Sequence, residues 1–197
     1  MSSQKVRELY LDYLKARVYT FGRGDLGQLG HKNNLDQSKP KMIENIKNTK
    51  SVSCGLNHTA VIDEKGQIWS FGLNLNGQLG REYKQIGAEM IKGFKNIKSV
   101  SCGGTHTAFI NENGQVYTFG NAEYGQLGNT LSHFKPEMIE GFKNIKSVSC
   151  GVNHTAFINE KGQVYTFGWG EFGQLGHGNA PSQLEPKMIE GFKNIKS

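Results

Sequence analysis

Three histidines and three cysteines recur at one fixed interval, and both residue types can do chemistry. Each series repeats every 48 residues, and the members are Cys54, His58, Cys102, His106, Cys150 and His154. A histidine can act as a general base, and a thiolate as a nucleophile or a metal ligand. A single active site needs one base, and a metal site needs ligands at short spacing. Three equivalent copies are therefore predicted to be structural, with each imidazole bonded to backbone and each cysteine buried as a small apolar side chain.

A second repeated series consists of lysines in the segment Gly-Phe-Lys-Asn-Ile-Lys. Its members are Lys95, Lys98, Lys143, Lys146, Lys193 and Lys196. Equivalent positions in stacked repeats fall on one rim, so these lysines are predicted to form an arc of positive charge. Such an arc could bind phosphate or an acidic surface in a salt-dependent way. The alternative is that the lysines only solvate strand ends and protect sheet edges.

Positions that differ between the copies are better candidates for specificity. They lie in the segment before each Gly-Gln-Leu-Gly, and the candidates are Arg23, Asp25, Tyr124, Trp169, Glu171 and Phe172. Exposed aromatic side chains beside charges are typical of a protein-binding hot spot. The alternative is that these side chains pack on the neighbouring repeat.

Two segments match the dinucleotide fingerprint Gly-x-Gly-x-x-Gly, at residues 22–27 and 168–173. That fingerprint needs a helix whose N-terminus holds the pyrophosphate, whereas here the chain continues into Gly-Gln-Leu-Gly and a loop. These segments are predicted to be turns. No nucleophile, base and oxyanion donor come together anywhere in the chain, so we expect no catalytic residues, no cofactor and no metal.

The elements that position these residues are copies of one unit. Gly-Gln-Leu-Gly begins at Gly27, Gly77, Gly125 and Gly173, at intervals of 50, 48 and 48 residues, and each copy follows an aromatic strand-like run such as VYTFG. A full unit reads as four short strands, with the second and third joined at Gly66, Gly114 or Gly162 by a hairpin that needs positive φ. Four antiparallel strands in about 48 residues predict a β-propeller blade.

The predicted units span residues 18–50, 51–98, 99–146 and 147–197, and the first of them is only a half unit. Residues 1–17 differ from the rest: a serine can cap a helix there, and Val6, Leu9 and Tyr13 fall on one apolar stripe. We therefore expect a short amphipathic N-terminal helix that packs over an exposed blade edge.

The bulk composition restricts the class of protein. The 197 residues carry a net charge of +6, with 23 Lys and Arg against 17 Asp and Glu. This mild basicity suits an acidic partner or nucleic acid without establishing either. No apolar run approaches the about 20 residues that cross a bilayer, and the N-terminus is too charged for a secretory signal. An intracellular protein is expected, either cytoplasmic or nuclear.

The block from Ser147 to Gly176 combines SVSCG, HTAFI, GQVYTFG and GQLG at fixed offsets. It resembles the RCC1 (regulator of chromosome condensation) repeat family, and the resemblance extends from Val18 to the end of the chain. The resemblance implies an all-β fold of RCC1-type β-propeller blades. The family forms seven-bladed rings, so three complete four-stranded blades plus a half blade imply an incomplete ring. We expect a truncated product, a self-associating half ring, or an open arc shielded by the N-terminal helix.

For function, the sequence favours a non-enzymatic interaction module or scaffold that binds a protein through its rim loops. The alternative implied by the resemblance is guanine-nucleotide exchange on a small GTPase. In the family, exchange depends on a wedge between blades, and the nearly constant unit length leaves no room for one. Self-association is a further expectation, chromatin or nucleic acid remains an open partner without support, and no membrane contact is expected.

Overall fold

The computed structural model describes residues 16–82, 86–178, 181–192 and 195. These residues form one two-stranded and three four-stranded antiparallel sheets, which we number as blades in chain order. The first blade pairs β1 (Tyr19–Gly22) with β2 (Gln37–Met42), and the second contains β3 (Thr49–Cys54), β4 (His58–Asp63), β5 (Ile68–Gly72) and β6 (Glu89–Met90). The third contains β7 (Ile97–Cys102), β8 (His106–Asn111), β9 (Val116–Gly120) and β10 (His133–Met138). The fourth contains β11 (Ile145–Cys150), β12 (His154–Asn159), β13 (Val164–Gly168) and β14 (Gln183–Met188).

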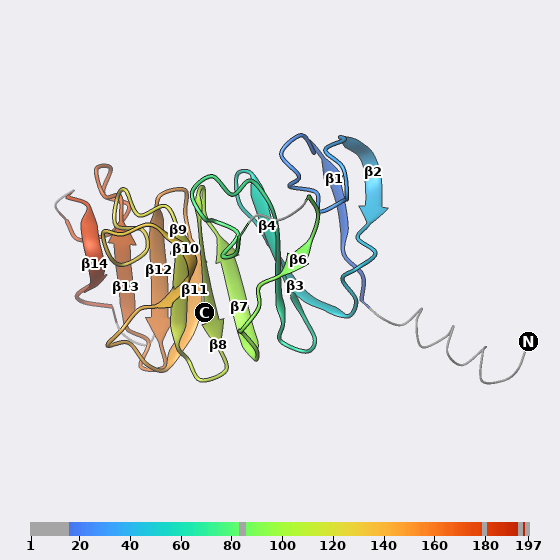
Figure 1. Cartoon of the computed structure of the whole chain (residues 1–197). Helices are drawn as coiled ribbons and strands as arrows, with labels where there is room; N and C mark the ends of the chain where they lie inside the picture. Colours follow the sequence, from blue (N-terminus) through green and yellow to red (C-terminus); the bar gives the residue numbers. More distant parts are fainter. Residues whose placement is uncertain (1–15, 83–85, 179–180, 193–194, 196–197) are drawn as a thin grey trace, which may run out of the picture.

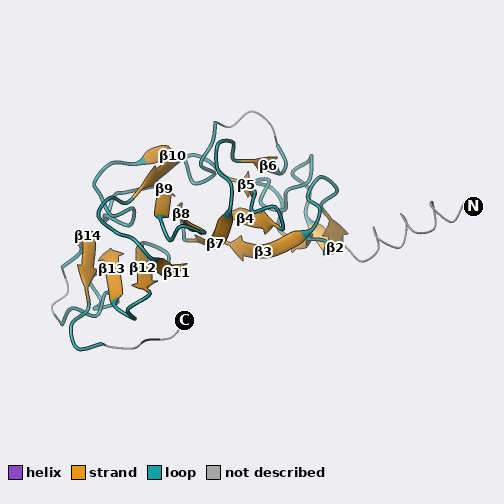
Figure 2. Cartoon of the chain, turned by 90° about the horizontal axis from the view of Figure 1, so that it is seen from below, coloured by secondary structure: helices purple, strands orange, loops and turns teal. Residues whose placement is uncertain are grey.

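The blades stand side by side along an arc (Figure 1). Seen from below, each four-stranded sheet radiates outward from its first strand, and β6, β10 and β14 lie outermost (Figure 2). The first strands β3, β7 and β11 contact one another in sequence along the inside of the arc. The all-β fold of three complete blades and a half blade predicted from the repeats is confirmed.

The hairpin glycines serve both the turn and the contact between blades. Gly66 and Gly114 have φ of +67° and +68°, a region that L side chains rarely adopt. Each glycine carbonyl also accepts a backbone hydrogen bond from the first residue of the next blade, with Ile97 at 3.0 Å and Ile145 at 2.9 Å. A Cβ on Gly114 would lie 2.8 Å from the Cα of Asn144. A side chain is therefore excluded on two grounds.

Apolar side chains fill each junction between blades. Between the second and third blades, Ile62, Ile68 and Ile91 form a cluster with Ile97, Phe109 and Phe119, all at most 2% exposed. The next junction repeats the arrangement with Ile110, Val116, Ile139, Ile145, Phe157 and Phe167. One sheet thus supplies mainly aliphatic side chains and its neighbour mainly aromatic ones. Because this apolar surface lies on the sheet faces, no blade can bury its own core alone.

Serine and cysteine join the inner strands. The Ser53 hydroxyl accepts the amide N–H of Cys102 at 2.9 Å, and Ser101 accepts that of Cys150 at the same distance. Cys102 is buried and Cys150 half-buried, but Cys54 is exposed. The prediction that all three cysteines are buried is therefore wrong for Cys54. In the later blades the preceding blade covers the side chain at this position. Among the described residues the first blade has two strands, and neither is an inner strand.

The two ends of the arc expose the surfaces that the internal junctions bury. At the first blade, Tyr19 is 54% and Phe21 63% exposed, whereas Phe71, at the position equivalent to Phe21, is fully buried. At the fourth blade, Ile158 and Val164 are only half-buried. An aromatic face at one end and an aliphatic face at the other thus remain partly open to solvent among the described residues.

The N-terminal helix predicted over residues 1–17 lies almost entirely outside the described residues. The two of its residues that are described, Ala16 and Arg17, are not helical, and the Ala16 carbonyl accepts a hydrogen bond from the Thr49 amide at 3.1 Å. None of the described residues belongs to a helix long and apolar enough to cross a membrane.

We predict that Gly114→Ala destabilises the protein more than Gly141→Ala. Both glycines have positive φ, but a Cβ on Gly141 would meet nothing within 4 Å. The control should therefore lose only the about 1 kcal/mol of backbone strain, and Gly114→Ala about 1–3 kcal/mol more because blades must separate. Urea unfolding measures both variants. Equal losses would contradict the close approach of Asn144.

Candidate functional site

The repeated histidines link each blade to the next through a threonine. His58 Nε2 lies 2.8 Å from the Thr107 hydroxyl of the third blade, and that hydroxyl donates to the Gln78 carbonyl at 2.9 Å. His106, Thr155 and Gln126 repeat the arrangement between the third and fourth blades. Because the hydroxyl proton is used on the carbonyl, the imidazole must donate from Nε2. The predicted structural role fits this geometry, but the partner is a side chain of the next blade rather than backbone.

Burial keeps these imidazoles neutral. Desolvation lowers the pKa of His58 to about 4, and that of His106 to about 3 with a smaller contribution from the neighbouring histidines. The Nδ1 atoms of both are buried without a hydrogen-bond partner. An acceptor nitrogen that is closed off from solvent has no access to a substrate proton. His154 is half-buried, and burial lowers its pKa as well.

The structure brings three of the predicted binding residues together on the loop rim. The rings of Tyr124, from the third blade, and Trp169, from the fourth, have centroids 5.9 Å apart. Phe172 packs edge-on against Trp169 at 5.0 Å while remaining 80% exposed. We call these three side chains the aromatic rim. The rings therefore pack across a blade junction, as the alternative expected, and Phe172 also remains exposed to solvent.

The corresponding position between the first and second blades is hollow instead. Leu26 and Leu73 stand where Tyr124 and Trp169 stand in the later copies, and they help to line a cavity of about 350 Å³. Leu75, on the same rim, is 78% exposed. The loop rim is therefore apolar along much of its length, and the aromatic residues concentrate at its far end.

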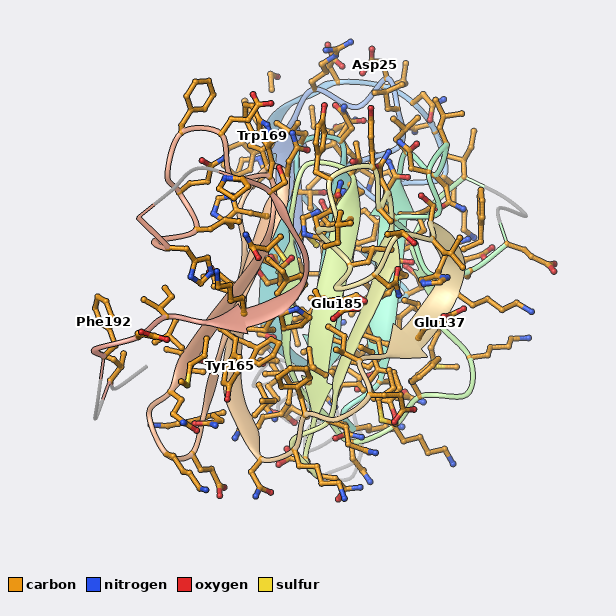
Figure 3. All side chains as sticks on the ribbon, turned by 90° about the vertical axis from the view of Figure 1, so that its left-hand side faces the viewer. Asp25, Glu137, Tyr165, Trp169, Glu185 and Phe192 are labelled. Carbon is orange, nitrogen blue, oxygen red and sulfur yellow. The ribbon has the colours of Figure 1, made fainter. Side chains whose placement is uncertain are left out.

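The remaining loop candidates lie on the same rim but apart from the aromatic cluster. Figure 3 shows Asp25 and Trp169 at one end of the molecule, although they belong to the first and fourth blades. Arg23 forms an exposed ion pair with Asp25 at 2.6 Å, and this hydrogen bond lowers the pKa of the carboxyl group. Glu171 is exposed beside the aromatic rim.

The four repeated lysines that the structure describes lie on the opposite rim. Gly168 pairs with His154 at one end of the fourth blade, whereas β11 begins at Ile145 at the other end. Lys95, Lys98, Lys143 and Lys146 are exposed there, and Lys193 and Lys196 lie outside the described residues. The equivalent Lys50 pairs with Glu112 of the next blade at 3.7 Å. Hairpin glutamates thus alternate with these lysines, which makes the rim mixed in charge rather than uniformly positive.

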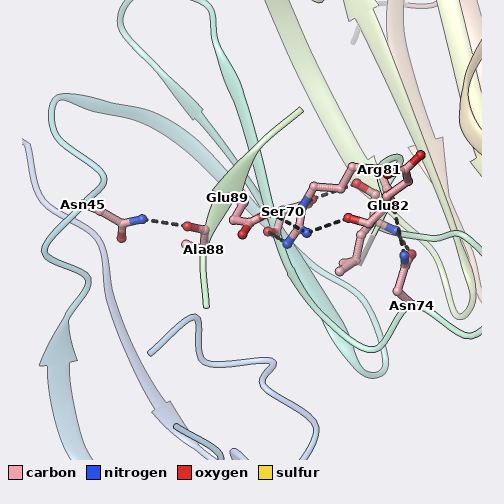
Figure 4. Close-up of polar contacts among 8 residues, drawn as sticks. Asn45, Ser70, Asn74, Arg81, Glu82, Ala88 and Glu89 are labelled. Atoms are coloured by element: carbon pink, nitrogen blue, oxygen red, sulfur yellow. Dashed lines mark hydrogen bonds and ion pairs between the residues drawn. The ribbon is translucent and has the colours of Figure 1, made fainter. Parts of the chain in front are cut away.

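Arg81 is a buried side chain that the sequence patterns did not single out. Its guanidinium is buried, with Nε 3.2 Å from the Ser70 hydroxyl, Nη2 donating to the Ser70 carbonyl at 3.0 Å and Nη1 paired with Glu89 at 2.9 Å. Figure 4 shows this network. His31 and His177 occupy the same position in the first and fourth blades and contact Thr20 and Thr166. A comparison of the four copies at the position of Arg81 would have shown that the second blade departs from the others there.

Known proteins share this architecture. The family model described as RCC1-like domain matches residues 13–197. The chain belongs to this RCC1-like family. Protein RCC2 homolog of Xenopus laevis is 41% identical over 69 residues, which are 34% of this chain and 14% of that protein. X-linked retinitis pigmentosa GTPase regulator of Homo sapiens is 48% identical over 66 residues, which are 32% of this chain and 6% of that protein.

Solved RCC1-like structures agree over most of the described chain. Human WBSCR16 superposes with a TM-score of 0.78 at 25% identity and covers 87% of this chain and 52% of its own. Prp20p of Saccharomyces cerevisiae gives a TM-score of 0.78 at 22% identity, covering 89% of this chain and 46% of its own, and shows the fold alone. The chain therefore spans about half the length of these solved chains, and the matched segments are a small part of the curated relatives.

We predict that the RCC1-like array loses stability as the pH falls from 7 to 5. The pKa values of His58 and His106 in the folded chain lie below 6.5, so between these values the unfolded chain binds protons that the folded chain does not. Stability should be full above pH 6.5 and fall by about 2 kcal/mol for each histidine by pH 5. The urea midpoint as a function of pH measures this effect.

A matched variant isolates the histidine contribution. His106→Gln retains a donor for Thr155 and removes one titrating group, so the loss between pH 7 and 5 should shrink by about 2 kcal/mol. A variant that keeps the full pH dependence would show that other groups cause it.

Proposed function

We propose that this chain is a non-enzymatic interaction module that binds a protein partner through the loop rim of its blades, in an intracellular setting. The aromatic rim carries the proposal, because Tyr124, Trp169 and Phe172 form a partly exposed cluster beside Glu171. Tryptophan and tyrosine are the side chains most enriched among residues that dominate protein interfaces. The cluster is also built at a junction between two blades, which holds its rings in place.

The rest of the described chain supports a binding role over catalysis. Of the repeated histidines, His58 and His106 are neutral, buried and hydrogen-bonded to threonine side chains. The thiol of Cys102 is desolvated, and burial raises its pKa to about 12, so it is a poor nucleophile. Among the described residues, no three histidine, cysteine or acidic side chains gather where they could hold a metal ion.

Guanine-nucleotide exchange on a small GTPase is the second candidate function. A matched relative is named a GTPase regulator, and the solved Prp20p is described by its binding to Gsp1p and to histones. These names keep a GTPase partner, and more remotely a chromatin partner, among the proposals for this chain. A GTPase bound at the aromatic rim would be consistent with both an interaction module and an exchange factor. These two functions differ only in whether the release of nucleotide is accelerated.

Self-association is part of the proposal because one end of the arc exposes an aliphatic sheet face and the other an aromatic one. The internal junctions pair an aliphatic face with an aromatic one, and the ends offer Ile158 and Val164 on one side and Phe21 on the other. Stacking of a second copy would repeat a contact that the chain already makes.

We predict that the double variant Trp169→Ala, Phe172→Ala loses its protein partner while remaining folded. Truncating two aromatic anchors should cost about 2 kcal/mol or more, a loss of at least about thirtyfold in affinity. Affinity enrichment from a cell extract with wild-type and variant baits identifies the partner, and a titration with the purified partner measures the loss.

The control is Lys98→Ala, Lys146→Ala on the opposite rim, which should retain the partner. Equal retention by the aromatic variant would contradict the proposed surface. Release of fluorescent GDP from a panel of small GTPases then separates the two functions, because acceleration at catalytic amounts of the chain would select exchange over a simple interaction module.

For self-association, we predict a mass of about twice 21.8 kDa at high concentration and a lower mass for Phe21→Ser. The substitution removes an exposed ring from the open aromatic face without touching an internal junction. Light scattering coupled to size exclusion measures both masses. A wild-type mass of 21.8 kDa at all concentrations would contradict this part of the proposal.

A further inference from the structure

A groove lies at the outer edge of the second blade, beside the third. Its volume is about 810 Å³, within the range of ligand-binding clefts. One wall comes from Arg81, Glu89 and Met90 of the second blade, and the other from Lys135 and Pro136 of the third. Trp69, Phe94 and Lys92 complete the lining.

A local departure from the repeat opens this groove. The outer strand β6 has two residues, whereas β2, β10 and β14 have six. Ala88 replaces the proline found at this position in the other three strands, and its amide donates to the Gly30 carbonyl of the first blade at 3.1 Å. The Asn45 amide also donates to the Ala88 carbonyl at 2.6 Å (Figure 4). Both bonds hold this segment toward the first blade, on the side away from Pro136.

The wall of the groove is pre-organised by the buried arginine. The ion pair between Arg81 and Glu89 joins side chains that are only 9% and 22% exposed, and Arg81 also caps the Ser70 carbonyl on the outer edge of β5. The guanidinium thereby adds a side-chain hydrogen bond at the point where β5 pairs with the short strand β6. A groove that exists without a ligand loses little free energy to rearrangement on binding.

One residue that lines the groove has the opposite charge to its equivalents in the other blades. Lys92 stands where the other three copies carry Glu44, Glu140 and Glu190. Lys135 lies on the opposite wall, and both lysines are exposed. Neither lysine has an ion pair with a described residue, whereas Arg81 is neutralised by Glu89. Two free ammonium groups therefore face the same open space.

The apolar part of the groove is rigid. The Trp69 indole donates to the Asp63 carboxylate at 3.1 Å, and its body packs against the core between the first two blades. Phe94 packs edge-on against Phe109 and Tyr117 at 5.2 and 5.4 Å. Both aromatic side chains remain half-buried, so part of each faces the groove.

We propose that this groove binds an extended acidic peptide segment of a partner protein, with carboxylates between Lys92 and Lys135 and apolar side chains against Trp69 and Phe94. Glu82 and Glu89 also line the groove. A peptide can place its apolar residues beside these two glutamates, whereas a nucleic acid backbone carries a negative charge at every nucleotide and is therefore disfavoured. The inference deepens the proposed interaction role and adds a surface separate from the aromatic rim.

The test uses a fluorescein-labelled peptide of nine alternating glutamate and leucine residues and measures its affinity by fluorescence anisotropy. The wild-type chain should bind it with a Kd well below about 1 mM, more tightly at low salt. Lys92→Glu should weaken binding at least about tenfold, because it restores the charge that three other blades carry at this position and adds repulsion. Lys161→Glu, on an exposed hairpin of the fourth blade, is the matched control and should bind as the wild type does.

Three results would overturn the proposal: no binding up to about 1 mM, equal weakening by Lys161→Glu, or equal affinity for the same peptide with lysine in place of glutamate. Tighter binding of a nine-nucleotide oligothymidylate that Lys92→Glu abolishes would replace the peptide with nucleic acid. The variant Trp169→Ala, Phe172→Ala should keep full affinity for the acidic peptide. The proposal for the groove and the proposal for the aromatic rim can therefore be disproved independently of each other.

Discussion

The junction between neighbouring blades is the interaction on which the rest of this structure depends. Each four-stranded sheet carries an aliphatic face and an aromatic face, and neither is buried until another sheet lies against it. Since the hydrophobic effect scales with the area removed from water, most of the stabilisation of a blade comes from its neighbours. The exposed Phe21 at one end, compared with the fully buried Phe71 one repeat later, shows how far burial depends on that neighbour.

A polar network accompanies the apolar core at every junction. The hydroxyl of Thr107 serves His58 of the preceding blade and the Gln78 carbonyl at once, so three groups are satisfied in a region closed to solvent. The same arrangement at His106 and Thr155 explains why residues with catalytic chemistry recur with the fold. Their repetition reflects a shared structural requirement, and it leaves the loops and outer edges free to carry specificity.

The second blade shows how such an array acquires an individual feature. A proline is lost at Ala88, a histidine becomes Arg81, and a glutamate becomes Lys92, all within one unit. Arg81 and Glu89 form a largely buried ion pair next to β6, the shortest of the outer strands. The sheet keeps its inner strands although its outer strand is short. The outer strand contributes little to the junctions, and variation there costs the core less than variation at an inner strand would.

The sequence by itself determined the all-β blades, their antiparallel order and the hairpins at Gly66 and Gly114, because alternation of side chains and turn glycines are local properties of the chain. It also singled out Tyr124, Trp169 and Phe172. Only the tertiary structure decided that these three rings meet on one rim, that the four described lysines of the repeats lie on the other, and that Arg81 is buried. Contacts such as His58 with Thr107 join residues 49 positions apart. The angle and register at which one sheet stacks on the next set those contacts, and no local pattern encodes them.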